Sequence, residues 1–132
     1  MTLYSKCILA PISPEDGTRI SVMSRHTLND GKTPDPRITH DLFQEHLTIF
    51  APPVKLIGAY YKRGLPWEEF EKQYRAYLQE PETQQHVAAL AERALNTDIT
   101  IMCIEETPEH CHRRLLAEHC KTLIPALEII IR

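Results

Sequence analysis

The feature that most constrains the fold of this chain is an apolar run that leads through a polar turn into a helix. Residues 99–104 are almost continuously apolar, as is typical of a strand buried on both faces of a parallel sheet. Thr107 is a suitable N-cap, Pro108 suits the first helical turn, and the helix is predicted to continue to about Thr122. A buried strand followed directly by a helix is typical of α/β proteins.

The rest of the chain repeats this alternation. Strands are predicted over 3–10, 19–24, 54–61 and 127–131, and helices over 41–49, 67–80 and 82–95. Residues 27–39 contain two prolines and no periodic apolar pattern, which predicts a mobile loop that could cover a pocket. We therefore expect one α/β domain over residues 1–132, with a mostly parallel sheet flanked by helices in a Rossmann-like three-layer arrangement.

Composition narrows the classes of function. An apolar fraction of 42% with 25% charged residues is ordinary for a globular protein, and a net charge of -3 disfavours nucleic acid or an anionic membrane as a bulk partner. No apolar run approaches the ~20 residues of a membrane span, and the N-terminus is a poor signal peptide. A cytoplasmic location is expected, so Cys7, Cys103, Cys111 and Cys120 are interpreted as reduced thiols.

Polar residues follow the predicted strands, where ligands of parallel sheets bind. Arg25 and Glu105 each stand just after a strand and are expected to meet the Cys111 helix at one rim. One interpretation is an anion site, in which Arg25, Arg113 and the backbone amides that begin at Thr107 hold a phosphate or carboxylate. Guanidinium groups suit such anions because they bind them with two parallel hydrogen bonds.

A second interpretation makes Cys111 a nucleophile. Its thiol pKa would be lowered by a helix N-terminus and by the neighbouring His112 and Arg113. His112 could itself assist bond-making, and Glu105 could orient Arg113 or act as an acid or base. Phosphatase-like chemistry is disfavoured, because only one residue separates Cys111 from Arg113 and no phosphate-cradling loop fits between them.

Metal binding is the third interpretation. The ligand types are present in six residues, but no C-x-x-C or H-x-x-x-H pair occurs among Cys103, His110, Cys111, His112, His119 and Cys120. On spacing alone the sequence predicts no metal site and no cofactor.

Each of these residues also has a structural interpretation. Cys103 and Cys111 can be small core residues, since cysteine is among the most buried residue types. Glu105 can simply accept hydrogen bonds from Arg113 and fix the turn. The aromatic residues within 67–80 lie at helical spacing, which is more typical of a core-facing helix than of a stacking platform.

The segment from 103 to 118 resembles a known family. Cys103-Ile-Glu105, five residues, and then Cys111-His112-Arg113, followed by two leucines, an alanine and a glutamate, is similar to the C-terminal signature of the domain-of-unknown-function 488 (DUF488) family. The early strand that ends in Arg25 also fits, although no acid stands at positions 21–23 where the family often has Asp-x-Arg. The resemblance implies a small α/β domain and no assigned activity.

The working hypothesis is a rim pocket that binds a small phosphorylated or nucleotide-like anion. Its expected members are Arg25, Glu105, Cys111, His112 and Arg113. The rival hypothesis is a non-catalytic interaction module in which the same motif is structural. The sequence predicts neither the substrate nor the oligomeric state.

Overall fold

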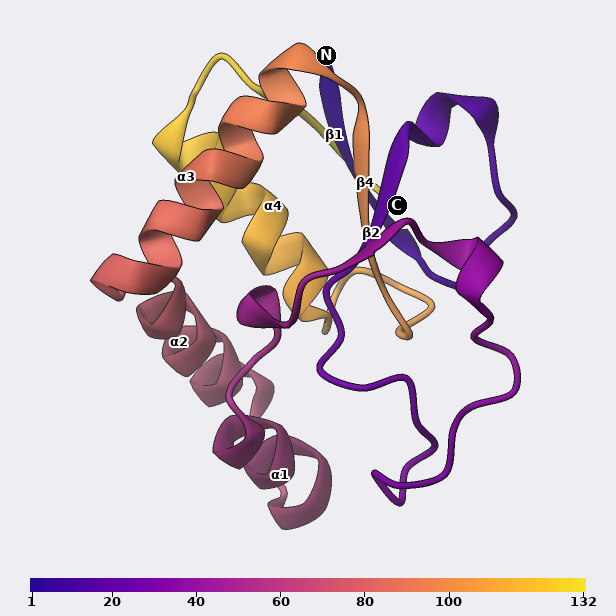
Figure 1. Cartoon of the computed structure of the whole chain (residues 1–132). Helices are drawn as coiled ribbons and strands as arrows, with labels where there is room; N and C mark the ends of the chain where they lie inside the picture. Colours follow the sequence, from indigo (N-terminus) through magenta and orange to yellow (C-terminus); the bar gives the residue numbers. More distant parts are fainter.

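The computed structural model describes residues 1–132 and contains one five-stranded, all-parallel sheet (Figure 1). The strand order is β3-β2-β4-β1-β5, so β4 and β1 are central. The strands are β1 Thr2–Cys7, β2 Thr18–Ser21, β3 Glu45–His46, β4 Ile99–Cys103 and β5 Glu128–Ile131. The predicted α/β class is confirmed, and the apolar run at 99–104 forms the middle strand, where both faces are covered.

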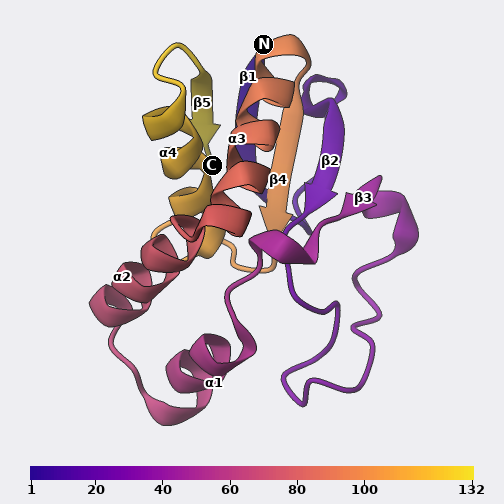
Figure 2. The same ribbon diagram turned by 60° about the vertical axis from the view of Figure 1, so that its left-hand side comes forward.

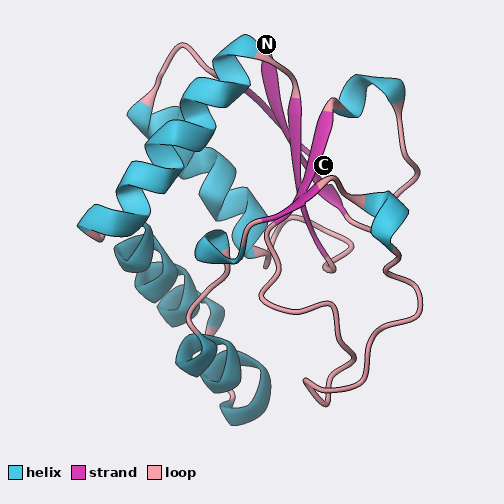
Figure 3. Ribbon diagram, viewed as in Figure 1, coloured by secondary structure: helices cyan, strands magenta, loops and turns pink.

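Four helices flank the sheet: α1 Val54–Arg63, α2 Trp67–Leu78, α3 Pro81–Asn96 and α4 His112–Leu123. Figures 1 and 3 show them together on one side of the sheet. The opposite face is covered by the 3-10 turns η1 Pro14–Asp16 and η2 His40–Leu42 and by the long loop after β2. The third layer of the fold therefore consists of short turns and a long loop instead of helices.

The main core lies between the sheet and its helices. Leu3, Ile99 and Ile101 are fully buried in a cluster with apolar residues of α3 and α4, such as Leu90 and Leu115. Burying each such side chain stabilises the fold by roughly 1.5–3 kcal/mol. This packing fixes the carboxyl ends of the strands and the start of α4 relative to one another.

The other face of the sheet holds a buried ionic cluster. The Asp16 carboxylate accepts hydrogen bonds from Lys6 Nζ at 2.9 and 3.0 Å and from Arg19 Nη1 at 2.5 Å. The Thr100 hydroxyl donates to the Asp16 carbonyl at 2.7 Å. These bonds hold η1 against β1, β2 and β4. The turn η1 thus covers a part of the sheet where a helix would otherwise pack.

Two predicted elements are wrong. The segment predicted as a strand over 54–61 is helix α1. Its apolar residues include Leu56 and Tyr60, which are four apart and pack toward the core, and Gly64 ends the helix in the left-handed conformation with φ of 73°. The helix predicted over 41–49 is absent, because this segment forms η2, the short strand β3 and the 3-10 turn η3 Thr48–Phe50.

Helix α4 also begins later than predicted. Its N-cap is Cys111, which has extended backbone angles, and Thr107 lies in the preceding loop. The chain needs residues 104–110 to return from the end of β4 before it can start a helix that packs on the sheet. The threonine and proline at 107–108 belong to this return turn.

Candidate functional site

A cavity of about 460 Å³ opens beyond the carboxyl ends of β2 and β4. It lies between the loop after β2, helix α1 and the turn after β4, which Figure 2 shows around the lower end of the sheet. Ligands of parallel α/β sheets bind at this end of the strands, and the volume suits a small organic ligand. The cavity therefore lies at the end of the sheet where the site was expected.

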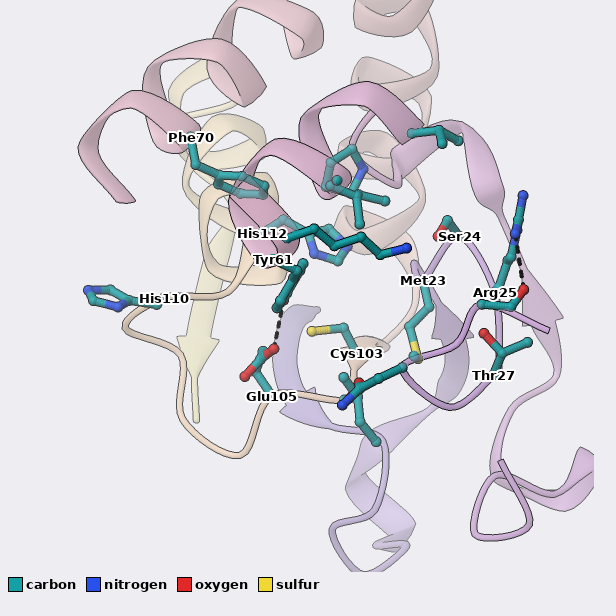
Figure 4. A pocket seen from close by; sticks show the side chains of 18 of the residues that line it. Met23, Ser24, Arg25, Thr27, Tyr61, Phe70, Cys103, Glu105, His110 and His112 are labelled. Carbon is teal, nitrogen blue, oxygen red and sulfur yellow. Dashed lines mark hydrogen bonds between the residues drawn. The ribbon is translucent and has the colours of Figure 1, made fainter. Parts of the chain in front are cut away.

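One wall of the cavity is aromatic. Trp67 stacks on Phe70 with ring centroids 5.0 Å apart and on His110 with centroids 4.8 Å apart. Figure 4 shows Phe70 and His110 on one side of the cavity and Arg25 and Thr27 on the other. A flat ring could stack against this wall while its polar groups face the loop.

Three charged residues line the cavity: Arg25, Lys62 and Glu105. Arg25 donates to the carbonyl of Gly31 at 3.1 Å, and neither cation forms an ion pair. Glu105 accepts a hydrogen bond from the Tyr61 hydroxyl at 2.7 Å (Figure 4). Together these three residues carry one net positive charge.

His112, the first residue of α4, lies at the inner end of the cavity. Its Nε2 is 2.8 Å from the carbonyl oxygen of Val22. Because a carbonyl can only accept, Nε2 carries the proton and Nδ1 is the unprotonated nitrogen. Burial lowers the pKa of His112 to about 4, against the opposing effect of the Val22 hydrogen bond, so the ring is neutral at pH 7.

Cys103 and Cys111 are joined as a disulfide, so the prediction of reduced thiols is wrong for this pair. Cys7 and Cys120 are free. The turn after β4 brings Cys111 back to the end of the strand that carries Cys103, which the linear spacing did not show. Cys103 lines the cavity, whereas Cys111 is buried behind the wall.

Arg113 is fully buried and does not line the cavity. Its guanidinium donates to Ser5 Oγ and to the carbonyl of Arg132, both at 2.8 Å, and to the carbonyl of Glu105 at 3.2 Å. The contact with Glu105 thus uses the backbone and not the carboxylate. Arg113 ties β1, the end of β5 and the turn after β4 together.

Comparison with protein families supports the family resemblance that the motif indicates. The family model DUF488-N3a, described as the active DUF488-N3 subclade, matches residues 3–122. The chain belongs to the DUF488 family. No curated protein and no solved structure matches it. None of its helices is both long enough and apolar enough to pass through a bilayer.

In this DUF488 protein the expected site residues fall into two groups. Arg25, Glu105 and His112 line the cavity, whereas Cys111, Arg113 and Thr107 do not. Thr107 is exposed and precedes the N-cap, so the amides near it are not the N-terminal amides of α4.

Sequence reasoning missed the contribution of α1 to the cavity. Residues 54–61 were predicted as a strand, and neither Tyr61 nor Lys62 was expected in the site. In the helix they follow Ile57 and Gly58 by four residues, and all four line the cavity. The spacing of apolar residues over 54–63 fits a helix, but so short and apolar a segment fits an extended strand as well.

Proposed function

We propose that this DUF488 protein binds a small anionic, nucleotide-like ligand in the cavity at the carboxyl ends of β2 and β4. The observation that carries the proposal is the combination of two unpaired cations with an aromatic wall in one cavity of about 460 Å³.

The charged side suits a phosphate or carboxylate. Arg25 has donors to spare, because its hydrogen bond to the Gly31 carbonyl uses only one of its nitrogens. Lys62, on α1, supplies a second, mobile cation. A single phosphate between them would meet complementary charge on both sides.

The aromatic side suits a planar ring such as a nucleobase. Stacking on an aromatic side chain is worth roughly 1–3 kcal/mol per base and tolerates different bases. Glu105 lies nearby, and its carboxylate can accept hydrogen bonds from an amino or hydroxyl group of the ligand.

A catalytic role of His112 would be to orient a bound group. Burial lowers its pKa to about 4 and keeps the imidazole neutral at pH 7, so Nδ1 can accept a hydrogen bond but is a weak base at this pH. The Cys111 sulfur can act as a nucleophile only after the disulfide with Cys103 is reduced.

A second candidate is a non-catalytic module in which the motif is structural. The hydrogen bonds of Arg113 favour it for that one residue, because all of them go to the protein itself. They do not bear on Arg25 and Lys62, which line the cavity.

The test is a thermal-shift and calorimetric comparison of adenosine monophosphate, adenosine and inorganic phosphate. We expect adenosine monophosphate to raise the Tm by a few degrees, since a ligand at about 100 times its Kd adds ~2.7 kcal/mol. Lys62→Ala should weaken binding about tenfold. The matched control is Lys72→Ala, which removes an exposed lysine of α2 that does not line the cavity.

Two results would contradict the proposal. One is the absence of any shift with all three probes. The other is a ligand whose affinity falls equally in Lys62→Ala and Lys72→Ala, because such a ligand would bind through general surface charge.

A further inference from the structure

Three metal-ligating side chains meet at the inner end of the cavity. The sulfurs of Cys103 and Cys111 and a ring nitrogen of His112 all lie within 4.8 Å of one another. They come from the end of β4, the N-cap of α4 and its first helical residue. The motif spacing hides this group because Cys103 is eight residues before Cys111, but the return turn closes that distance.

We propose that the reduced protein binds one zinc-type divalent cation through Cys103, Cys111 and His112, with the fourth coordination position open to the cavity. The proposal goes beyond the proposed ligand and does not depend on it, since the three side chains would hold the ion whether or not an anion is bound.

The donor set fits such an ion. Two thiolates and one imidazole are ligands that zinc and other soft or borderline metals prefer, and three protein ligands with one open position are typical of catalytic zinc. Two thiolates cancel the charge of a divalent cation, so the buried site would be neutral overall.

The backbone positions also leave room for an ion. The Cα atoms of Cys103 and Cys111 are 7.6 Å apart. Two thiolates on one tetrahedral zinc lie about 3.8 Å apart, because each Zn–S bond is about 2.3 Å long. Once the disulfide is reduced, the two backbone positions leave space for an ion between the sulfurs.

The surroundings of His112 match those of a metal-bound histidine. Such a histidine usually donates its second ring N–H to a carbonyl or carboxylate, which fixes the tautomer and the ring. Nε2 of His112 donates to Val22 in this way and leaves Nδ1 as the nitrogen with a free lone pair.

The fourth position follows from the placement of the ligands. Cys103 and His112 line the cavity, while Cys111 lies behind it. An ion between the three would have its remaining face toward the cavity, where water or a polar group of a ligand could bind it.

Metal binding and the disulfide exclude one another, and the two forms are linked by a balanced step. A dithiol reductant transfers two electrons and two protons to the Cys103–Cys111 bond and leaves as a disulfide. Zinc then displaces the two thiol protons into solvent and binds the thiolates.

The test uses Co²⁺ as the probe. The full-length protein is reduced with dithiothreitol, desalted without oxygen and titrated with Co²⁺. We expect a near-ultraviolet thiolate-to-cobalt charge-transfer band and visible bands of tetrahedral Co²⁺, which saturate at one ion per chain and disappear when one equivalent of Zn²⁺ is added. The oxidised protein of the same sequence should show neither band.

Variants locate the site. Cys111→Ser should lose the charge-transfer band, and His112→Asn should shift or weaken the visible bands. Cys7→Ser is the matched control, because it removes a free thiol outside the group and should leave the spectrum unchanged. Circular dichroism establishes that each variant is folded.

The proposal is overturned if the reduced protein shows no thiolate band. It is equally overturned if a folded Cys111→Ser protein keeps the wild-type spectrum, or if Cys7→Ser loses it. None of these outcomes bears on nucleotide binding, which the thermal-shift experiment measures separately.

Discussion

Replacing Asp16 by asparagine is expected to lower the free energy of unfolding by about 4 kcal/mol. The Asp16 side chain is 1% exposed and neutralises two buried cations, Lys6 and Arg19. Asparagine has nearly the same shape but no charge, so it leaves two uncompensated cations in a poorly solvated place. Removing one partner of a buried ion pair costs roughly 3–5 kcal/mol.

Equilibrium urea unfolding at pH 7 measures the change. With an m-value of about 2 kcal/mol/M, a loss of about 4 kcal/mol moves the midpoint down by about 2 M. The matched control is Glu15→Gln, one residue earlier. Glu15 pairs with Arg132 at 2.8 Å, but the two side chains are 50% and 42% exposed. That exposed pair should contribute at most about 1 kcal/mol.

The same carboxylate predicts a pH dependence. Burial of Asp16 opposes ionisation, but the Ser13 amide, Lys6 and Arg19 outweigh burial and hold its pKa below the usual value. A carboxyl group with a lowered native pKa stabilises the fold above its unfolded pKa of about 3.9, and that stability is lost as pH falls through the native pKa. Asp16→Asn should lack this acid-dependent part. The reasoning is refuted if Asp16→Asn and Glu15→Gln have midpoints within 0.5 M, by rough estimate, at pH 7.

Three further predictions concern single residues. Arg113→Met should lower the free energy of unfolding by about 2–4 kcal/mol in urea, because three acceptors lose a charged donor inside the fold. Gly17→Ala should cost about 3 kcal/mol or more, since its Cβ would overlap the Asp98 carbonyl, whereas Gly64→Ala, which also has a positive φ but open space around it, should cost only about 1 kcal/mol. Burial raises the pKa of Cys120 to about 12, so an aromatic disulfide reagent at pH 8 should label this thiol in the unfolded protein but not in the native one.

The sequence predicted the elements whose periodicity is unambiguous. The central strand β4 is a continuous apolar run, and α2 and α3 carry apolar residues at helical spacing between clear proline starts. Helix α1 was missed because its eight predicted residues are too few to separate a helical from an extended pattern when most are apolar.

Only some of the residues that line the cavity could be predicted from the sequence, because the others depend on the path of the chain in three dimensions. Residues just after strands, such as Arg25 and Glu105, are directed to the cavity by the parallel topology alone. The position of Cys111 depends instead on the path of the 104–110 turn, and the contribution of Lys62 depends on α1 being a helix. Local pattern does not determine either of these.

The Cys-His-Arg part of the motif serves two sides of the fold at once. Successive residues in a helix project about 100° apart, so His112 can face the cavity while Arg113 faces β1. Arg113 also donates to the Glu105 carbonyl and so holds the turn that carries Glu105 and His110 onto the cavity wall.

A substitution of Arg113 would therefore move this wall. It would weaken ligand binding and also lower the free energy of unfolding. A substitution of Lys62 changes the charge of the wall without touching the turn. Comparing stability and affinity in the two variants thus separates a residue that builds the cavity from one that contacts its ligand.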